Sequence, residues 1–177
     1  MRRAICALVA ALVLASCGYR AGFALRDGGS VGVAMFGNDS KERDLEAELH
    51  EQLTDAAQRM IESPLVAPSR CDYLVTGRIT DYRGRRGIRN ADNVRLESGV
   101  RISIVAQLVR GRGRPGAATE PEDVLREVTL SEERGFLFQD PGGEAQARAL
   151  VLRTLAERAV IDLFADIAWS APPERQP

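Results

Sequence analysis

The sequence has few of the residues that build metal or disulfide scaffolds. It contains 3 Cys and 1 His in 177 residues, and no Cys-x-x-Cys pair. A structural zinc site needs a full set of such ligands at close spacing, and a disulfide framework needs paired thiols. Both kinds of scaffold are therefore excluded.

An excess of positive charge is also missing. The 24 basic and 25 acidic residues nearly cancel, so no net positive field exists to hold nucleic acid or an anionic membrane surface. A nucleic-acid-binding protein is therefore disfavoured. The chain is 45% hydrophobic and has 177 residues, which is long enough for one globular domain and too short for two ordinary ones.

The N-terminal apolar run is too short for a permanent transmembrane helix. It extends from Ala4 to Ala15 after Arg2 and Arg3, whereas crossing a bilayer takes roughly 20 residues. A charged start, a short apolar run and small residues before a cysteine are typical of a secretory signal peptide.

The end of this segment, Leu14-Ala15-Ser16-Cys17, matches a bacterial lipobox. We expect cleavage between Ser16 and Cys17, removal of residues 1–16 and palmitate-type lipid on the Cys17 thiol, with no other cofactor and no metal. Gly18 stands where Asp would retain a lipoprotein at the inner membrane, so we expect a lipid anchor on the periplasmic side of the outer membrane. The alternative is an ordinary signal peptide that happens to contain a Cys.

The mature chain divides into a tether, a domain and a tail. Residues 17–29 are rich in Gly and lack apolar periodicity, which indicates a lipidated tether, and residues 170–177 are polar and rich in Pro, which indicates disorder. The domain is expected over residues 30–169. Within it, alternating apolar positions predict strands over 31–36, 73–83, 100–109 and 124–133.

Two amphipathic helices are predicted. Asp39 or Ser40 can cap the first helix, Asp39 forming a capping box with Glu42, and Pro64 ends it near residue 62. Asp140 followed by Pro141 is expected to open the second, which extends to about residue 168. The apolar positions predicted to pack are Leu45, Leu49, Leu53, Ala56, Ala57 and Met60 in the first helix, and Ala149, Leu152, Leu155, Ala156, Ala159, Val160, Leu163 and Ile167 in the second.

The order strand, helix, three strands, helix predicts an α+β fold. Its most suitable form is a two-layer sandwich with both amphipathic helices packed on a four-stranded mixed sheet. The second and third strands should form an antiparallel hairpin. A right-handed crossover would place the first helix on the same face as the last and leave the other face of the sheet open.

Residues for catalysis are scarce, and we expect no enzyme. His50 lies at the edge of the apolar stripe of the first helix, where a boundary residue is a simpler interpretation than a catalytic base. We interpret Cys71 as a small apolar side chain that packs beside a strand. The sequence has no nucleophile elbow, no phosphate-binding Gly-Lys-Ser/Thr and no metal-spaced cluster.

Arginines gather in two predicted loops. Arg83, Arg85, Arg86 and Arg89 lie close together in the loop after the second strand, and guanidinium groups pair well with phosphate. We single out Arg85, Arg86 and Arg89 as candidate contacts to a lipid phosphate or an acidic partner; a solvated hairpin tip is the alternative. A second group in the next loop is expected at the opposite end of the third strand, and comprises Arg110, Arg112 and Arg114.

Several segments together resemble the LPS-assembly lipoprotein family, LptE. They are Cys17-Gly18-Tyr19-Arg20 after the lipobox, the strand from Val31 to Phe36 with its following helix, the stretch Asp72-Tyr73-Leu74-Val75-Thr76-Gly77-Arg78-Ile79-Thr80-Asp81-Tyr82, and the closing Asp162-Leu163-Phe164-Ala165-Asp166-Ile167-Ala168-Trp169. The resemblance extends from Leu14 to Trp169 and rests on the order and spacing of soft motifs.

The resemblance implies an outer-membrane lipoprotein seated inside the β-barrel LptD, which it helps to fold and to deliver lipopolysaccharide. Of the site residues, only Cys17 carries over from the family. A lipoprotein that acts as scaffold or activator for a secretion channel or a peptidoglycan synthase is the competing interpretation. Such a protein needs a long tether, whereas residues 17–29 reach roughly 40 Å when fully extended, which suits a domain held near the membrane.

Overall fold

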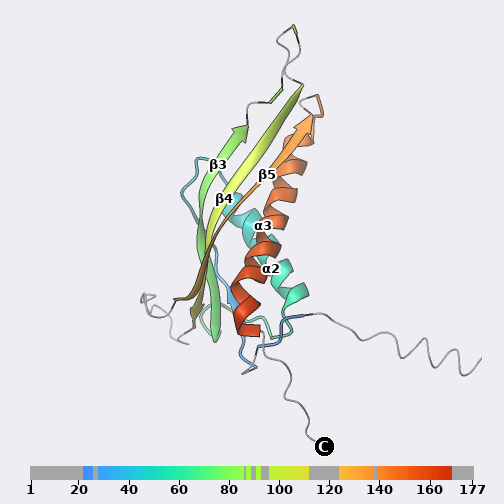
Figure 1. Cartoon of the computed structure of the whole chain (residues 1–177). Coiled ribbons are helices and arrows are strands. Elements are labelled where there is room, and N and C mark those ends of the chain that lie inside the picture. The colour runs from blue at the N-terminus through green and yellow to red at the C-terminus, as the bar shows by residue number, and fades with distance from the viewer. Residues whose placement is uncertain are drawn as a thin grey trace, which may run out of the picture.

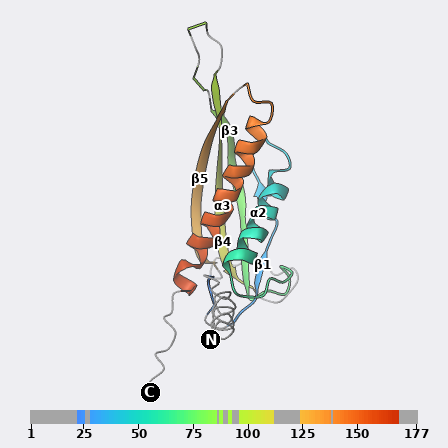
Figure 2. The same cartoon turned by 90° about the vertical axis from the view of Figure 1, so that its right-hand side faces the viewer.

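The computed structural model describes residues 22–25, 28–85, 87–88, 91–92, 96–111, 124–137 and 139–168. Its elements are β1 (Val31–Val33), β2 (Gly37–Asn38), α2 (Leu45–Met60), β3 (Tyr73–Arg85), β4 (Glu97–Arg110), β5 (Val124–Leu137) and α3 (Gly143–Ala168). Figure 1 shows a long curved sheet with two helices beside it, and Figure 2 shows both helices on the same face. The predicted two-layer α+β architecture is confirmed, and no helix of the described residues covers the other face of the sheet.

The sheet is mixed, with β1, β3, β4 and β5 as neighbours in that order. Both β1 and β2 pair with β3 in parallel, as expected for strands joined through a crossover helix. The hairpin of β3 with β4 and the pairing of β4 with β5 are antiparallel. Apolar side chains from β4 and both helices form one buried cluster between the layers.

The first strand is broken, although its pattern predicts continuous strand from Val31 to Phe36. Ala34 donates its N–H to Val75, and the chain then leaves the sheet until Gly37. Met35 is exposed, whereas Phe36 is only 2% exposed. A Cβ placed on Gly77 would lie 2.7 Å from Cε2 of Phe36, so the break lets this ring pack directly over the glycine backbone of β3.

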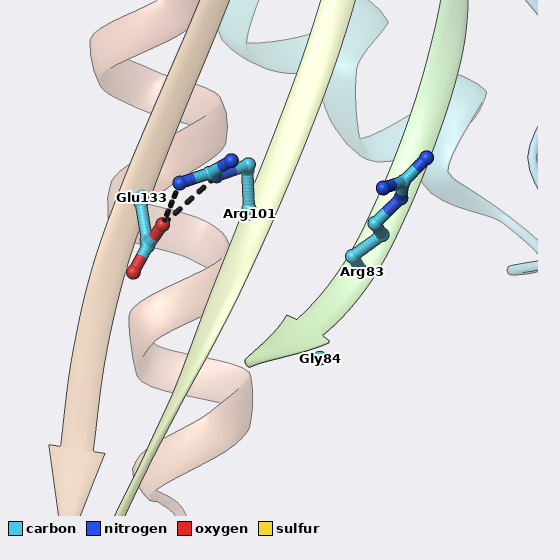
Figure 3. A pocket seen from close by; sticks show the side chains of 4 residues that line it. All are labelled: Arg83, Gly84, Arg101 and Glu133. Atoms are coloured by element: carbon cyan, nitrogen blue, oxygen red, sulfur yellow. Dashed lines mark hydrogen bonds and ion pairs between the residues drawn. The ribbon is translucent and has the colours of Figure 1, made fainter. Parts of the chain in front are cut away.

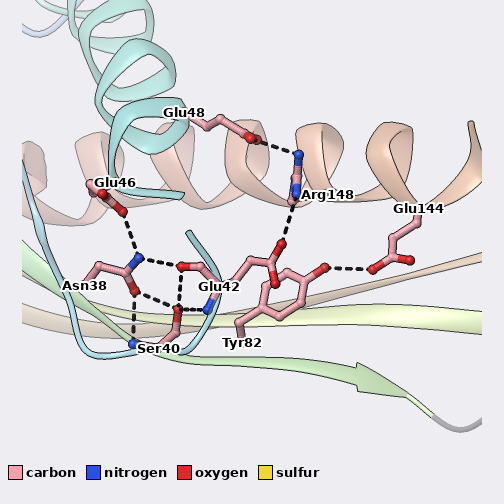
Figure 4. Close-up of polar contacts among 8 residues, drawn as sticks. All are labelled: Asn38, Ser40, Glu42, Glu46, Glu48, Tyr82, Glu144 and Arg148. Carbon is pink, nitrogen blue, oxygen red and sulfur yellow. Dashed lines mark hydrogen bonds and ion pairs between the residues drawn. The ribbon is translucent and has the colours of Figure 1, made fainter. Parts of the chain in front are cut away.

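The connection into α2 differs from the predicted capping box. The helix begins at Leu45 rather than near Asp39, and its N-cap residue Asp44 has φ 65° and makes no side-chain cap hydrogen bond. Asn38 organises the turn instead. Its amide nitrogen donates to the Glu42 carbonyl and the Glu46 carboxylate, and its oxygen accepts from Ser40, as Figure 4 shows.

The helix stripes are largely as predicted. In α2 the buried residues are Leu45, Leu49, Leu53, Ala56 and Ala57, with Met60 half-buried. In α3, Ala149 is exposed, contrary to prediction, while Ala147, Val151 and Phe164 are buried in addition to the predicted set. The reason is that the buried stripe continues from Leu155 and Ala159 at four-residue spacing, which places positions 151 and 147 in it and leaves 149 outside.

The start of α3 also differs from prediction. Pro141 lies in a turn ahead of the helix, which begins at Gly143. Asp140 accepts a hydrogen bond from the Gly142 N–H at 3.1 Å, and Gly142 accepts the Gln146 N–H at 3.0 Å. The Asp-Pro pair therefore forms a turn that leads into the helix rather than its first residues.

A register shift in β3 changes which side chains face the helices. The pairing of β3 with β4 slips between Ile79 and Asp81, so Thr80 is an extra residue and the alternation reverses after it. Tyr82, predicted on the face opposite Ile79, is therefore packed against the core between the layers. Arg83 moves to the open face as a result.

Packing begins earlier in the chain than the expected tether boundary at residue 29. Phe23 exchanges backbone hydrogen bonds with Met60 and Glu62, and Leu25 is buried. These residues lie at one end of the sheet, where α3 also ends, and β3 ends and β4 begins at the other (Figure 1). The expected signal peptide, Cys17 and the tail after residue 169 lie outside the described residues.

The Tyr82 hydroxyl gives a testable readout of the interface between layers. It donates to Glu144 of α3 at 3.0 Å (Figure 4). Desolvation, and then the bond to Glu144, raise the pKa of Tyr82 to about 12. Because this pKa is higher in the folded state, Tyr82 contributes stability that is complete below pH 10 and is lost as the pH rises toward 12.

We expect the free energy of unfolding to fall less steeply between pH 10 and pH 12 in Tyr82→Phe than in the unchanged protein. Urea unfolding across that range measures it. Equal slopes in the two proteins would contradict the contribution of this hydroxyl.

Candidate functional site

The candidate site is the end of the sheet where β3 leads into β4. Two arginines lie side by side there on the open face, because Arg83 of β3 pairs in register with Arg101 of β4. With Gly84 and Glu133 they line a shallow hollow of about 420 Å³. Figure 3 shows the Arg101 guanidinium turned toward Glu133 of β5.

Each arginine of the hollow has a carboxylate partner. Arg101 donates to Glu133 at 2.6 and 2.8 Å, from Nη2 and Nε, and Arg83 lies 2.7 Å from Asp81. The guanidinium planes are held in place while most of Arg83 remains exposed. The hollow alone is therefore charge-balanced, and a phosphate would bind there by competing with carboxylates.

Apolar side chains are exposed beside these charges. Ile88, Leu96 and Leu137 are 57%, 40% and 68% exposed. They are neighbours across the strands, since Leu96 donates its N–H to Ile88 and Leu137 pairs with the adjacent Glu97. We call Arg83, Arg101, Ile88, Leu96 and Leu137 the distal end. Cations next to apolar surface are the complement of an anionic amphiphile.

The predicted arginines fall at two separate places. Arg85 is the last residue of β3 and pairs with Gly99, next to the distal end, whereas Arg86 and Arg89 lie outside the described residues. Arg110 pairs with Tyr73 at the other end of the hairpin, and Arg112 and Arg114 are not described. The predicted separation of the two loops is confirmed.

Sequence reasoning missed Arg101, Glu133 and Leu137. Each sits at an outward position of an alternating strand, where polar or isolated apolar residues are ordinary. Only the pairing register, Arg83 with Arg101 and Arg101 with Glu133, brings them together. The sequence does contain a signal, which is a charged residue at the same outward position of three consecutive strands. The signal can be recognised only when the register shift at Thr80 is known.

The two side chains considered for catalysis, His50 and Cys71, make contacts that fit a role in the structure of the fold. Nδ1 of His50 lies 3.4 Å from the Ala34 carbonyl, at the margin of α2. Cys71 is buried at 2% exposure and donates to the Pro68 carbonyl, and burial raises its pKa, which suppresses the thiolate. In the described ranges, no three His, Cys, Asp or Glu residues are placed to hold a metal ion.

No helix in the described part of the chain is both long and apolar enough to span a membrane. The long helix α3 has one buried face, and exposed charged residues such as Arg153 and Arg158 flank that face.

Comparison with known proteins identifies a fold and no family. No protein-family model matches the sequence, and no curated protein matches it significantly. Among solved structures, protein CT253 from Chlamydia trachomatis superimposes with a TM-score of 0.52 at 10% identity, covering 80% of this chain and 99% of that one. The PelC dodecamer from Paraburkholderia phytofirmans gives a TM-score of 0.50 at 13% identity, covering 81% and 94%.

Chains described as bacterial lipoproteins are also among the matches. Rare lipoprotein B from Shewanella oneidensis aligns over 74% of this chain and 94% of its own, at 10% identity and a TM-score of 0.39. That score is too low to support an argument. The comparisons therefore show a fold shared with CT253 and PelC.

Proposed function

We propose that this chain is an outer-membrane lipoprotein that binds an LptD-like β-barrel as its plug and takes part in lipopolysaccharide transport and outer-membrane assembly. The lipobox and the resemblance of the sequence to LptE support the anchor and the partner. The protein acts by binding, with no catalytic step and no cofactor beyond the lipid on Cys17.

The observation that carries the proposal is the placement of the distal end. Residues 22–25, which follow the predicted anchor, lie at the opposite end of the sheet (Figure 1). The α3 helix has 26 residues, so the domain is about 39 Å long at 1.5 Å per residue. The hydrocarbon core of a bilayer is about 30 Å thick. A domain of this length standing in a barrel reaches from the anchored leaflet to the level of the other leaflet.

The chemistry of the distal end fits lipopolysaccharide. Lipid A joins phosphates to acyl chains, so it requires cations beside apolar side chains. Arg83 and Arg101 supply cations held by carboxylates, and Ile88, Leu96 and Leu137 supply the apolar surface. Arg85, Arg86 and Arg89, which follow Arg83 in the sequence, add positive charge beyond these balanced pairs.

The partner is tested by purifying the full-length lipidated protein from its native outer membrane in mild detergent and identifying what co-elutes by mass spectrometry. A near-stoichiometric large β-barrel is expected. Recovery of a peptidoglycan synthase or a secretion channel without a barrel would overturn the proposal in favour of the scaffold interpretation.

The lipid ligand is tested by changing Arg85, Arg86 and Arg89 together to Ala. We expect binding of lipopolysaccharide to weaken by about tenfold or more, because the loss of even one charge-assisted hydrogen bond costs on the order of 1.5–3 kcal/mol when its partner is desolvated, and about 1.4 kcal/mol is a factor of ten in affinity. Binding is measured by titration with purified lipopolysaccharide in detergent.

Two controls separate phosphate recognition from general charge. Changing Arg59, Arg78 and Arg153 to Ala removes the same charge from exposed positions elsewhere and should leave binding within about twofold. Lipopolysaccharide with dephosphorylated lipid A should bind the unchanged protein and the triple variant of the loop equally. Unchanged binding after loss of the loop arginines would remove the phosphate assignment.

A further inference from the structure

The β5 strand is an edge of the sheet. It has 14 residues, and within the described sheet its only neighbour is β4. Its outer side is a row of backbone N–H and C=O groups that no other described strand covers. An edge of this length is a template for one more strand, and natural proteins control such edges through their side chains.

Side chains in the middle of β5 alternate between the two faces. Arg126, Val128, Leu130 and Glu132 pair with Leu108, Ala106, Ile104 and Ile102 of β4, all of them fully buried, so they lie on the helix face. Glu127, Thr129 and Ser131 lie on the open face. Charged residues on the helix face of an edge strand oppose indiscriminate pairing, because another strand would press them against apolar neighbours.

In one register of β5 against the β5 of a second copy, these charged residues lie opposite residues of the opposite charge. In an antiparallel pair with its two-fold axis at Thr129, Arg126 of each copy lies opposite Glu132 of the other, and Val128 lies opposite Leu130. Moving the axis by one residue, to Leu130, places Arg126 opposite Arg134 and Glu127 opposite Glu133. Opposite charges across strands stabilise a pair and like charges destabilise it, so the sequence favours the first register.

We infer that β5 binds a second copy of this chain, edge to edge and antiparallel over residues 126–132, with the two-fold axis at Thr129. The same patch then serves both copies, as in most homodimers, and the two sheets become one. Glu132 already accepts from Arg158 of α3 through Oε2 at 3.0 Å, and a carboxylate can accept from a second guanidinium. The inference does not depend on the proposed function, since it concerns the chain before it is seated in a barrel, whose interior would hold one copy.

The axis is tested by disulfide cross-linking of the full-length protein in mild detergent. In the inferred dimer, two copies of Thr129→Cys face each other directly. Two copies of Ser131→Cys lie four positions apart along the strands, about 13 Å, which is beyond the Cα separation that a disulfide spans. Both positions are exposed on the same face of the same strand, so Ser131→Cys is a matched control.

We expect a mild oxidant to convert most of the Thr129→Cys protein to a covalent dimer, and less than a tenth as much of Ser131→Cys or of the unchanged protein. Cross-linking of the unchanged protein measures what its own cysteines contribute, and of these Cys71 is buried. Equal cross-linking of both variants, or none, would overturn the inference.

The charge pairing is tested by reversal and rescue. Arg126→Glu should raise the dissociation constant of the dimer by about tenfold in analytical ultracentrifugation. The substitution places a carboxylate opposite Glu132 at both ends of the paired segment, and like charges across strands destabilise the pair. Adding Glu132→Arg should restore the dissociation constant to within about threefold. A dimer that is insensitive to Arg126→Glu, or that Glu132→Arg fails to rescue although circular dichroism shows an unchanged fold, would overturn the register.

Discussion

Replacing Gly77 with valine is expected to lower the free energy of unfolding by more than about 3 kcal/mol, because overpacking at this position meets backbone and an aromatic ring together. A Cβ at Gly77 would overlap the Val105 carbonyl oxygen of the neighbouring strand and lie 2.7 Å from Cε2 of Phe36 and 3.0 Å from the Cα of Ala106. None of these atoms is the free end of a flexible side chain. Urea unfolding followed by far-ultraviolet circular dichroism measures the loss.

Gly84 provides the matched control, since it lies on the same strand and a Cβ there would meet nothing within 4 Å. We expect Gly84→Ala to change stability by less than about 0.5 kcal/mol. If Gly77→Val were as mild as Gly84→Ala, the packing of Phe36 over the glycine would be wrong.

Truncation of Phe164 to Ala is expected to cost about 3–5 kcal/mol of stability, because it removes a fully buried ring and leaves a cavity. Phe164 is 0% exposed and belongs to the core cluster between α3 and its neighbours. A loss of this size is a large fraction of the stability of an ordinary domain, about 5–15 kcal/mol. The midpoint of urea unfolding should fall accordingly, with an unchanged slope.

Ile161 lies in the same helix, one turn earlier, and is 41% exposed. Ile161→Ala should cost less than about 1 kcal/mol, because the side chain is partly in water in both states. Similar losses for the two variants would contradict the orientation of α3 on the sheet.

Periodicity was enough to predict the layers, because alternation and helical stripes report directly on burial. The four strand regions, both helices and their common face follow from it. The break between β1 and β2 could not be predicted in the same way, since it depends on Phe36 meeting Gly77 of another strand. The same is true of Asn38, whose side chain replaces the expected capping box through contacts that only the folded turn creates.

The candidate site was predicted in part for a related reason. Local sequence was sufficient to single out Arg85 as one of a group of arginines at the end of a strand. Arg101 and Leu137 joined it only through pairing of strands, and Thr80, an unremarkable residue in an alternating run, decides which face Arg83 occupies. A single extra residue therefore decides which side chains of β3 face the site, although the sequence pattern around it does not reveal the shift.

The ends of the sheet can change more freely than its strands. Residues 22–25 and the last turn of α3 lie at one end (Figure 2), together with the end of β4 and the start of β5. The other end consists of the connections from β3 into β4, from β5 into α3 and into α2. Connections tolerate insertion and substitution far better than core strands do. A lineage that carried this fold could lengthen these connections or change their charge to suit a new partner, while the buried layer stayed the same.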